Sequence, residues 1–183
     1  MSKKLSEEYQ FKHLSAGQLL RDEKNTGSQL GEKIKTYIDK GNLVPSEIVV
    51  ELMKNAMSAA TDKHQQLFII DGFPRNQENV DIWEKLVGDS ALVIGILFLD
   101  CSEETMRNRI LKRGKEENRK DDTEEIFNNR TKIYREDTLP VVEQFKKQNK
   151  VFEVSAEGGI QETYDLCKKI VVSLNLEDFK EKQ

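Results

Sequence analysis

An arginine and two amides directly follow a short apolar run, and these are the residues best suited to hold a ligand. Residues 67–70 are apolar over the length of a buried strand, and the sequence Asp-Gly-Phe-Pro then ends it. Arg75 is therefore expected at the carboxyl end of a parallel strand, with Asn76 and Asn79 beside it. Ligands bind at that edge of open α/β sheets. A guanidinium grips two phosphate oxygens at once, so the segment is interpreted as a binding site.

The first part of the chain predicts three small helices, which would position this loop. Ser15 is expected to cap a helix that carries Arg21 two turns in. Residues 27–40 have apolar side chains at spacings of three and four, and Gly41 is expected to close that helix. Pro45 is expected to open a third helix. These helices form a small helical part, residues 15–60.

The second half of the chain predicts strands that alternate with helices. Residues 91–99 are nearly all aliphatic, as expected for a strand buried on both faces, and 151–154 is a further strand. Residues 112–125 are almost wholly charged or polar and are expected to be exposed or mobile. A long helix with a kink near Pro140 follows, and a last helix spans about 160–174. The alternation predicts an α/β protein with a parallel sheet and helices on both faces.

Composition and charge exclude several functions. The 183 residues suit a single domain, 1–183, and no apolar run is long enough to cross a bilayer. A net charge of -4 and a pI near 5.4 argue against nucleic acid as a partner, although clustered arginines can hold a small anion. Two cysteines, 66 positions apart, match neither a metal site nor a disulfide framework. With no secretory signal, we expect a cytoplasmic protein, the nucleus being the alternative.

Three motifs resemble those of the nucleoside monophosphate kinases, the adenylate kinase family. They are Asp-Gly-Phe-Pro-Arg-Asn-x-x-Asn from residue 71, Leu-Ser-Ala-Gly-Gln-Leu-Leu-Arg from residue 14, and Asn-Arg-Lys-Asp-Asp from residue 118. The Asn-x-x-Asn ending of the first resembles the UMP-CMP kinase branch. The resemblance implies phosphoryl transfer from ATP to a monophosphate. It also implies a monophosphate-binding helical part at 15–60 and a short lid at 112–125.

The resemblance also assigns roles to residues of this chain. The acceptor monophosphate would be bound by Arg21, Leu43, Val44, Gly72, Phe73, Arg75, Asn79 and Arg130. ATP would be bound by Arg109, Arg113, Arg119 and the backbone at Gly158. Charge stabilisation in catalysis would come from Arg75, Arg113, Arg119 and Arg130, with Asp121 and Asp122 pairing with arginines as the lid closes. Asp71 would act as an outer-sphere carboxylate for Mg²⁺, the expected cofactor with ATP.

The base of the acceptor nucleotide is predicted from the two carboxamides that follow Arg75. A carboxamide offers both a donor and an acceptor, and can accept uracil or cytosine by rotating. By resemblance, adenylate kinases place a glutamine after a threonine here, whereas this chain has Asn76 and Asn79. UMP, CMP and dCMP are therefore the expected acceptors.

One family feature is not found in these 183 residues. The family begins with a strand and a Gly-x-x-x-x-Gly-Lys phosphate loop, and in that fold the strand lies centrally, between those formed here by 67–70 and 92–99. No such loop occurs in the sequence. Because its backbone N–H groups cradle the donor phosphates, we expect little or no kinase activity from the 183 residues alone. The family implies a monomer, with a dimer as the alternative if the two strands find a partner.

Three function classes stay open at this point. The first is a UMP/CMP phosphotransferase, the second a catalytically dead module that binds a pyrimidine monophosphate, and the third an interaction protein. A lone arginine such as Arg109 is most often a solvated surface charge. His13, His64 and Trp83 are interpreted as structural or exposed residues with no chemical role.

Overall fold

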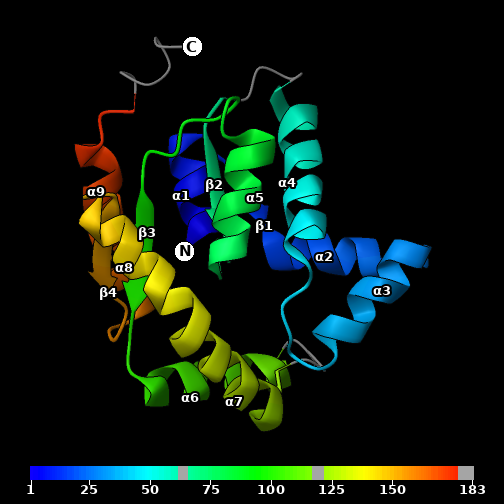
Figure 1. Ribbon diagram of the computed structural model, residues 1–183. Helices are drawn as coiled ribbons and strands as arrows, with labels where there is room; N and C mark the ends of the chain where they lie inside the picture. The colour runs from blue at the N-terminus through cyan, green and yellow to red at the C-terminus, as the bar shows by residue number, and fades with distance from the viewer. Residues whose placement is uncertain (62–65, 117–121, 177–183) are drawn as a thin grey trace.

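The computed structural model describes residues 1–61, 66–116 and 122–176 and has an α/β architecture (Figure 1). The helices are α1 (Ser2–Tyr9), α2 (Ala16–Lys24), α3 (Gln29–Ile38), α4 (Ser46–Thr61), α5 (Gln77–Val87), α6 (Glu103–Glu116), α7 (Glu124–Ile133), the π-helix η1 (Tyr134–Thr138), α8 (Leu139–Lys147) and α9 (Ile160–Ser173). The strands are β1 (Lys12–Ser15), β2 (Phe68–Asp71), β3 (Ile96–Asp100) and β4 (Val151–Ser155).

The strands form two parallel pairs. β1 pairs with β2, with Leu14 opposite Ile70, and β3 pairs with β4, with Leu97 opposite Phe152. No strand within the described ranges joins β2 to β3, and this is the place where the resemblance puts the family's first strand. Each of these two strands is paired along one edge. The parallel pairing and the helices on both sides agree with the predicted fold class.

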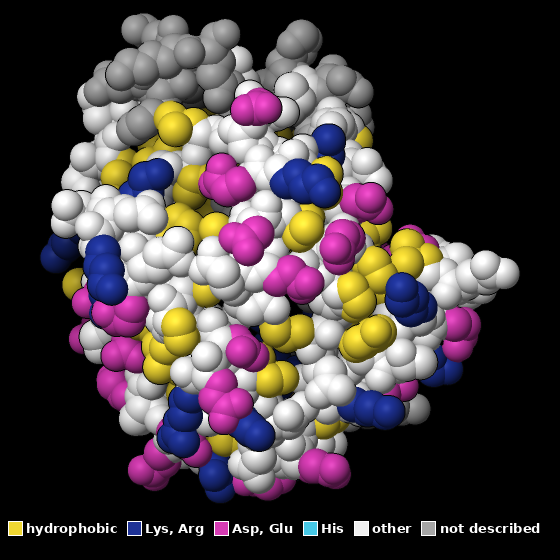
Figure 2. All heavy atoms as spheres, in the orientation of Figure 1, with side chains coloured by type: hydrophobic (Ala, Val, Ile, Leu, Met, Phe, Trp, Pro, Cys, Tyr) yellow, Lys and Arg dark blue, Asp and Glu magenta, His cyan; other side chains and the backbone are white. Residues whose placement is uncertain are grey.

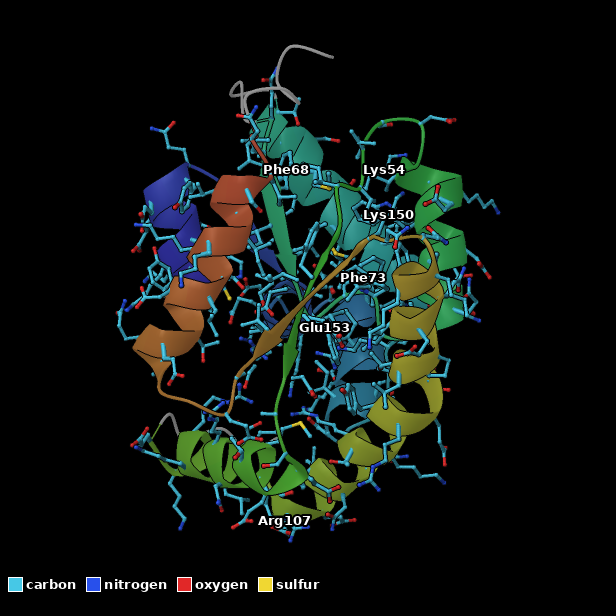
Figure 3. All side chains as sticks on the ribbon, turned by 90° about the vertical axis from the view of Figure 1, so that its left-hand side faces the viewer. Lys54, Phe68, Phe73, Arg107, Lys150 and Glu153 are labelled. Atoms are coloured by element: carbon cyan, nitrogen blue, oxygen red, sulfur yellow. The ribbon has the colours of Figure 1, made fainter. Side chains whose placement is uncertain are left out.

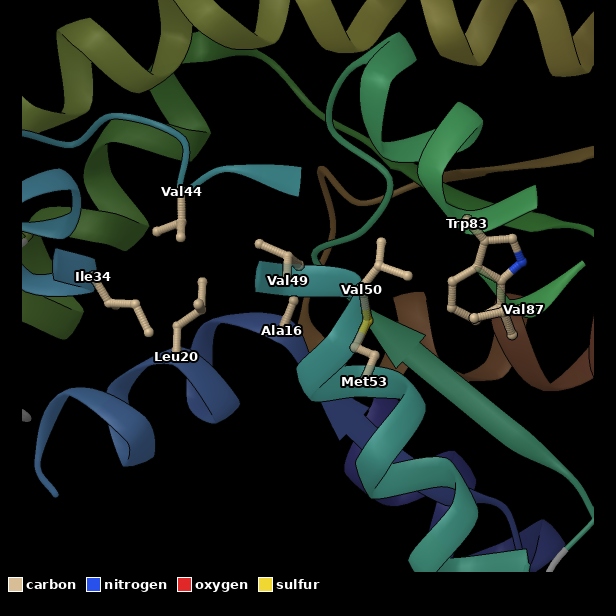
Figure 4. Packing of buried hydrophobic residues seen from close by; sticks show 9 residues of the cluster. All are labelled: Ala16, Leu20, Ile34, Val44, Val49, Val50, Met53, Trp83 and Val87. Carbon is tan, nitrogen blue, oxygen red and sulfur yellow. The ribbon is translucent and has the colours of Figure 1, made fainter. Parts of the chain in front are cut away.

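Side chains that alternate along β2 connect it to a separate core on each face. Ile70 packs against a cluster contributed by α2, α3, α4 and α5, and Figure 4 shows nine buried members of this cluster. Ile69 packs against the other cluster, which α1, β4 and α9 form around Leu5 and Cys167. Successive residues of a strand point to opposite faces, so β2 is held from both sides.

The aliphatic segment 91–99 is less buried than predicted. The strand in this segment is β3, and it begins only at Ile96. Ala91 and Val93 precede it and pack against the hydrophobic cluster of α2, α3, α4 and α5, here called the α4–α5 cluster. No side chain of β3 is fully buried, and Leu99 is 40% exposed. The prediction of burial on both faces is wrong at these residues. Pairing with β4 satisfies the backbone along one edge of β3, but it does not cover the side chains on the two faces.

Polar caps determine where several helices begin. The side chains of Ser15, Ser28, Asn76 and Thr123 each accept a hydrogen bond from a backbone N–H three residues later. The helix predicted at 27–40 consequently starts at residue 29. Gly41 follows it with φ of +71°, a conformation that glycine adopts without strain.

Both ends of the polar segment 112–125 belong to helices. α6 continues to residue 116 and α7 begins at 124, while 117–121 lie outside the described residues. Asp122 is only 5% exposed, so the prediction of an exposed segment is wrong at this residue. Its burial is compensated by two arginines, described below.

The long helix predicted across Pro140 is interrupted by a π-helix. α7, η1 and α8 follow one another without a loop, and Pro140 lies in the first turn of α8. Proline has no N–H to donate to the preceding turn, and the wider π-turn accommodates that loss where a simple kink was expected.

Charged side chains of both signs are interspersed over the face shown in Figure 2. This face therefore has no dominant basic surface of the kind that tracks a nucleic-acid backbone. In the described part of the chain, every helix is too short or too polar to cross a membrane.

Candidate functional site

A cavity of about 770 Å³ opens where β1 and β2 end. Four arginines line it: Arg21 from α2, Arg75 from the loop after β2, Arg113 from α6 and Arg130 from α7. The other predicted monophosphate-binding residues that line it are Leu43, Val44, Gly72 and Asn79. Residues from six segments of the chain are thus gathered at the carboxyl ends of two parallel strands, where the sequence placed the site.

Electrostatics at Arg75 favour an anion in this cavity. The side chain reaches solvent through the cavity, yet protein atoms surround it closely. This burial lowers the pKa of Arg75, and the positive charges of Arg130 and Arg21 lower it further, while Asp71 acts in the opposite direction. Arginine nevertheless stays protonated at neutral pH. The repulsion among three guanidinium groups is relieved when a phosphate binds between them.

The local sequence holds two of the arginines in place. Arg21 Nη2 donates to Gln18 Oε1 at 3.0 Å, one turn earlier on α2, and Gln18 Nε2 donates to Asp22 at 2.7 Å. Arg75 Nε donates to the carbonyl oxygen of Gly72 at 2.8 Å. Gly72 has φ of +76°, and a Cβ there would lie 3.0 Å from Arg75 Nη2, so glycine suits both the turn and the approach of the guanidinium.

Asp122 joins the other two arginines. Arg113 donates to both oxygens of this carboxylate, through Nε at 2.7 Å and Nη2 at 3.0 Å. Arg130 Nη1 donates to Oδ1 at 3.2 Å. The Asp122 side chain is fully buried, whereas the side chains of Arg113 and Arg130 are 40% and 28% exposed. One buried negative charge thus orients two cations toward the cavity.

Arg109 lies outside this cavity and contacts the loop after β4. Its guanidinium donates to the carbonyl oxygens of Ala156 at 2.6 Å, Glu157 at 3.4 Å and Gly158 at 2.9 Å. The Glu157 carboxylate in turn accepts from the Ser102 N–H and from the Thr105 hydroxyl at the start of α6. Arg109 and Gly158, both predicted to bind ATP, are therefore neighbours, and Arg109 braces the loop that contains Gly158.

Phe73 differs from the other predicted monophosphate-binding residues because it does not line the cavity. It packs against the α4–α5 cluster, with its ring centroid 5.5 Å from that of Trp83. Phe73 is partly buried and is labelled near the middle of Figure 3, whereas Arg107 on α6 is labelled at its lower edge. Phe73 anchors the loop that carries Arg75, a packing role that the motif alone did not indicate.

Asp71 lies at the end of β2 with its carboxylate about half exposed, 3.7 Å from His13 Nε2. Within the described part of the chain, no three acidic, histidine or cysteine side chains form a cluster able to hold a metal by themselves. Mg²⁺ with a nucleotide needs only one or two carboxylates, because phosphate oxygens and waters supply the other ligands. The single carboxylate of Asp71 fits this requirement. Arg119 and Asp121, the remaining predicted residues, lie outside the described residues.

Three contacts of the site were not predicted from the sequence. Asn79 is 5% exposed, and its side chain is hydrogen-bonded to Ser46, which contacts Glu78 in turn. The Thr138 hydroxyl, at the end of η1, donates to the carbonyl oxygen of Arg75 at 2.7 Å. Ser46 and Thr138 are 33 and 63 positions from their partners, so no local pattern could have revealed them.

Comparisons with known proteins agree with this architecture. The sequence model of the adenylate kinase family, described as "Adenylate kinase", matches residues 1–150. The UMP-CMP kinase of Rattus norvegicus is 41% identical over 170 residues, which are 91% of this chain and 87% of the relative. That of Homo sapiens is 41% identical over 165 residues, 88% of this chain and 84% of the relative. That of Danio rerio is 39% identical over 171 residues, 92% and 87% of the two chains.

The parallel strands with helices on both sides and the arginine-lined cavity at the strand ends define an α/β protein that binds anionic ligands. The match over most of the chain, together with the identity to these relatives, places it more closely: the chain belongs to the adenylate kinase family. It is by family a kinase, a phosphotransferase that binds nucleotides.

Proposed function

We propose that this chain carries the acceptor site of a pyrimidine nucleoside monophosphate kinase, which transfers a phosphoryl group from ATP to UMP, CMP or dCMP. The observation that carries the proposal is the meeting of Arg21, Arg75 and Asn79 in one cavity. Two guanidinium groups suit a monophosphate, and a carboxamide suits the edge of a pyrimidine. The UMP-CMP kinases that match most of the chain support the same acceptors.

The donor side of the proposal rests on Arg113 and Arg130. Both face the same cavity as the acceptor arginines and are held by Asp122. Negative charge on the equatorial oxygens of a transferring phosphoryl group is stabilised by cations fixed before the reaction. Arg119 and the backbone near Gly158, which Arg109 braces, would add contacts to ATP. Mg²⁺, held through water by Asp71, would neutralise charge on the phosphate oxygens.

We further propose that these 183 residues alone catalyse phosphoryl transfer slowly. The sequence contains no Gly-x-x-x-x-Gly-Lys segment to cradle the donor phosphates. One lost oxyanion-type donor costs about 10²- to 10³-fold in kcat, so a missing set of such donors lowers turnover by roughly three orders of magnitude or more. The second candidate is a module that binds a pyrimidine monophosphate without catalysis. It is favoured by the intact acceptor side of the cavity.

Nucleotide binding tests the acceptor assignment without requiring turnover. UMP and CMP at about 100 times Kd are expected to stabilise the chain by about 2.7 kcal/mol, which raises Tm by about 5–10 °C. AMP at the same concentration is expected to give a clearly smaller shift. Equal shifts with all three nucleotides would refute the choice of pyrimidines. The absence of any shift would refute the acceptor site and favour an interaction protein.

The expected setting of this activity follows from its substrates. A UMP/CMP kinase supplies diphosphates to pyrimidine nucleotide synthesis, so we propose a cytoplasmic or nuclear monomer whose partners are UMP, CMP and ATP. Fractionation of cells and light scattering of the purified protein test the two parts of this statement separately.

A further inference from the structure

The Asn79 carboxamide is held by two hydrogen bonds of opposite sense. Its Oδ1 accepts from the backbone N–H of Arg75 at 3.0 Å, and its Nδ2 donates to Ser46 Oγ at 2.8 Å. Asn79 and Ser46 are 5% and 1% exposed, so water does not replace either bond. A backbone N–H can only donate, and this alone requires oxygen rather than nitrogen on the Arg75 side of the amide.

A third hydrogen bond determines which atom of the Asn79 carboxamide lies on the Ser46 side. The Ser46 hydroxyl donates to Glu78 Oε2 at 2.6 Å, and it has a single hydrogen to give. Its oxygen can therefore only accept from Asn79. If the carboxamide were rotated by 180°, its nitrogen would face the Arg75 N–H, so that two donors would oppose each other. Its oxygen would then face the Ser46 hydroxyl, whose hydrogen is already donated to Glu78. Rotation of the carboxamide therefore breaks two buried hydrogen bonds at once.

This fixed orientation conflicts with reading both bases equally by rotation. Asn79 is among the residues that line the cavity, and its carboxamide has a second N–H and a second lone pair that these two bonds do not use. Uracil presents an acceptor at O4 beside a donor at N3, whereas cytosine presents a donor at N4 beside an acceptor at N3. A fixed amide that matches one of these edges opposes the other, provided that Arg21 and Arg75 hold the phosphate in one place.

We propose that Ser46 and Glu78 are positioning residues that fix the Asn79 carboxamide in one orientation and so make the cavity discriminate between uracil and cytosine. The inference rests on the proposed function, because it takes a pyrimidine monophosphate as the ligand. It goes beyond that function because it assigns base preference to a serine on α4 and a glutamate on α5 that need not touch the base.

Calorimetric dissociation constants for UMP, CMP and ribose 5-phosphate test the inference. One neutral hydrogen bond corresponds to about 2- to 10-fold in affinity, so the two bonds predict a difference of at least about fivefold between UMP and CMP in the native chain. Ser46→Ala is expected to reduce that ratio by about 2- to 10-fold, and Ser46→Thr, which keeps the hydroxyl, is expected to preserve it. Affinity for ribose 5-phosphate, which has no base, is expected to stay constant in both variants.

Glu78→Gln provides a second, surface-exposed variant in case Ser46→Ala does not fold. The new amide can donate to the Ser46 oxygen, and the Ser46 hydroxyl hydrogen is then no longer committed to residue 78. The Asn79 carboxamide is less strictly oriented as a result, so the ratio of the UMP and CMP affinities is again expected to fall. Glu84→Gln, an exposed change on the same helix, is the matched control and is expected to leave the ratio unchanged.

Several outcomes would overturn the inference. Equal affinity of the native chain for UMP and CMP would do so, and so would an unchanged ratio in both Ser46→Ala and Glu78→Gln. A parallel loss of affinity for all three ligands, ribose 5-phosphate included, would show a structural role only. Failure of the proposed function looks different, since UMP and CMP would then bind the native chain no more tightly than AMP.

Discussion

Asp122 is expected to be one of the most sensitive positions in the molecule, and Asp122→Asn tests this. The substitution keeps the shape of the side chain but replaces one acceptor oxygen with a donor. Asp122 now accepts three hydrogen bonds from Arg113 and Arg130. Asparagine can accept on one oxygen only, and its NH₂ group faces a guanidinium. Two clustered cations also lose a buried negative charge that compensates them.

The magnitude follows from burial. Breaking a buried ion pair costs about 3–5 kcal/mol. The Arg113 and Arg130 side chains are 40% and 28% exposed, so water compensates part of this loss, and about 1–3 kcal/mol of unfolding free energy is expected to disappear. For a chain of this size, that corresponds to a Tm lower by about 3–10 °C.

Scanning calorimetry measures the Asp122 effect, with Asp89→Asn as the matched control. Asp89 is exposed in the segment after α5, and its substitution is expected to change stability by less than about 0.5 kcal/mol. Added pyrophosphate is expected to restore more stability to Asp122→Asn than to the native chain, because it compensates the uncovered arginines. A Tm of Asp122→Asn within 1 °C of the control would refute the reasoning.

Three further predictions follow from other contacts. Arg75→Ala is expected to weaken UMP and CMP binding by about 100-fold or more, because it removes a charge-assisted pair of hydrogen bonds to phosphate. The control is Arg107→Ala, which lies outside the cavity and is expected to leave the calorimetric Kd values unchanged. Equal effects of the two substitutions would contradict the role of Arg75 in binding phosphate. Arg109→Met is expected to free the loop at 156–158, seen as faster amide hydrogen exchange there; unchanged exchange would exclude bracing. The Tyr164 hydroxyl donates to the Glu8 carboxylate, which raises the pKa of Tyr164 to about 12. While Glu8 is ionised, this contact therefore stabilises the fold fully below pH 10, and the stabilisation is lost as the pH rises through about 12. Titration of tyrosinate absorbance is expected to lose its highest component in Tyr164→Phe, and an unaltered curve would refute the pairing.

The sequence predicted local elements well where a short pattern determines them. Apolar spacing of three and four located α3, α4 and α9, and the Ser15 cap at the start of α2 follows from a single residue. The turn after β2 located Arg75 at the rim of the cavity for the same reason.

Features that depend on distant partners were not predicted. The polar composition of 112–125 predicted an exposed segment. The resemblance paired Asp122 with arginines, but the burial of Asp122 depends on Arg130 from another helix and has no local signal. Aliphatic composition made 91–99 look like a fully buried strand, although burial depends on which neighbours pair with β3. The orientation of Asn79 depends on Ser46, which lies 33 positions earlier. Such contacts follow from tertiary packing, and a single sequence does not contain them as local signals.

We propose above that this chain forms the acceptor side of a pyrimidine monophosphate kinase. A coupled assay of CMP and UMP phosphorylation by ATP and Mg²⁺ tests it most directly, on the 183 residues and on the same chain extended upstream by a strand and a phosphate loop. Both pyrimidine monophosphates are expected to be phosphorylated by the extended chain, at a rate roughly a thousandfold or more above that of the 183 residues. Comparable rates in the two forms would contradict the argument from the phosphate loop. Turnover of neither monophosphate in either form would contradict the claim itself.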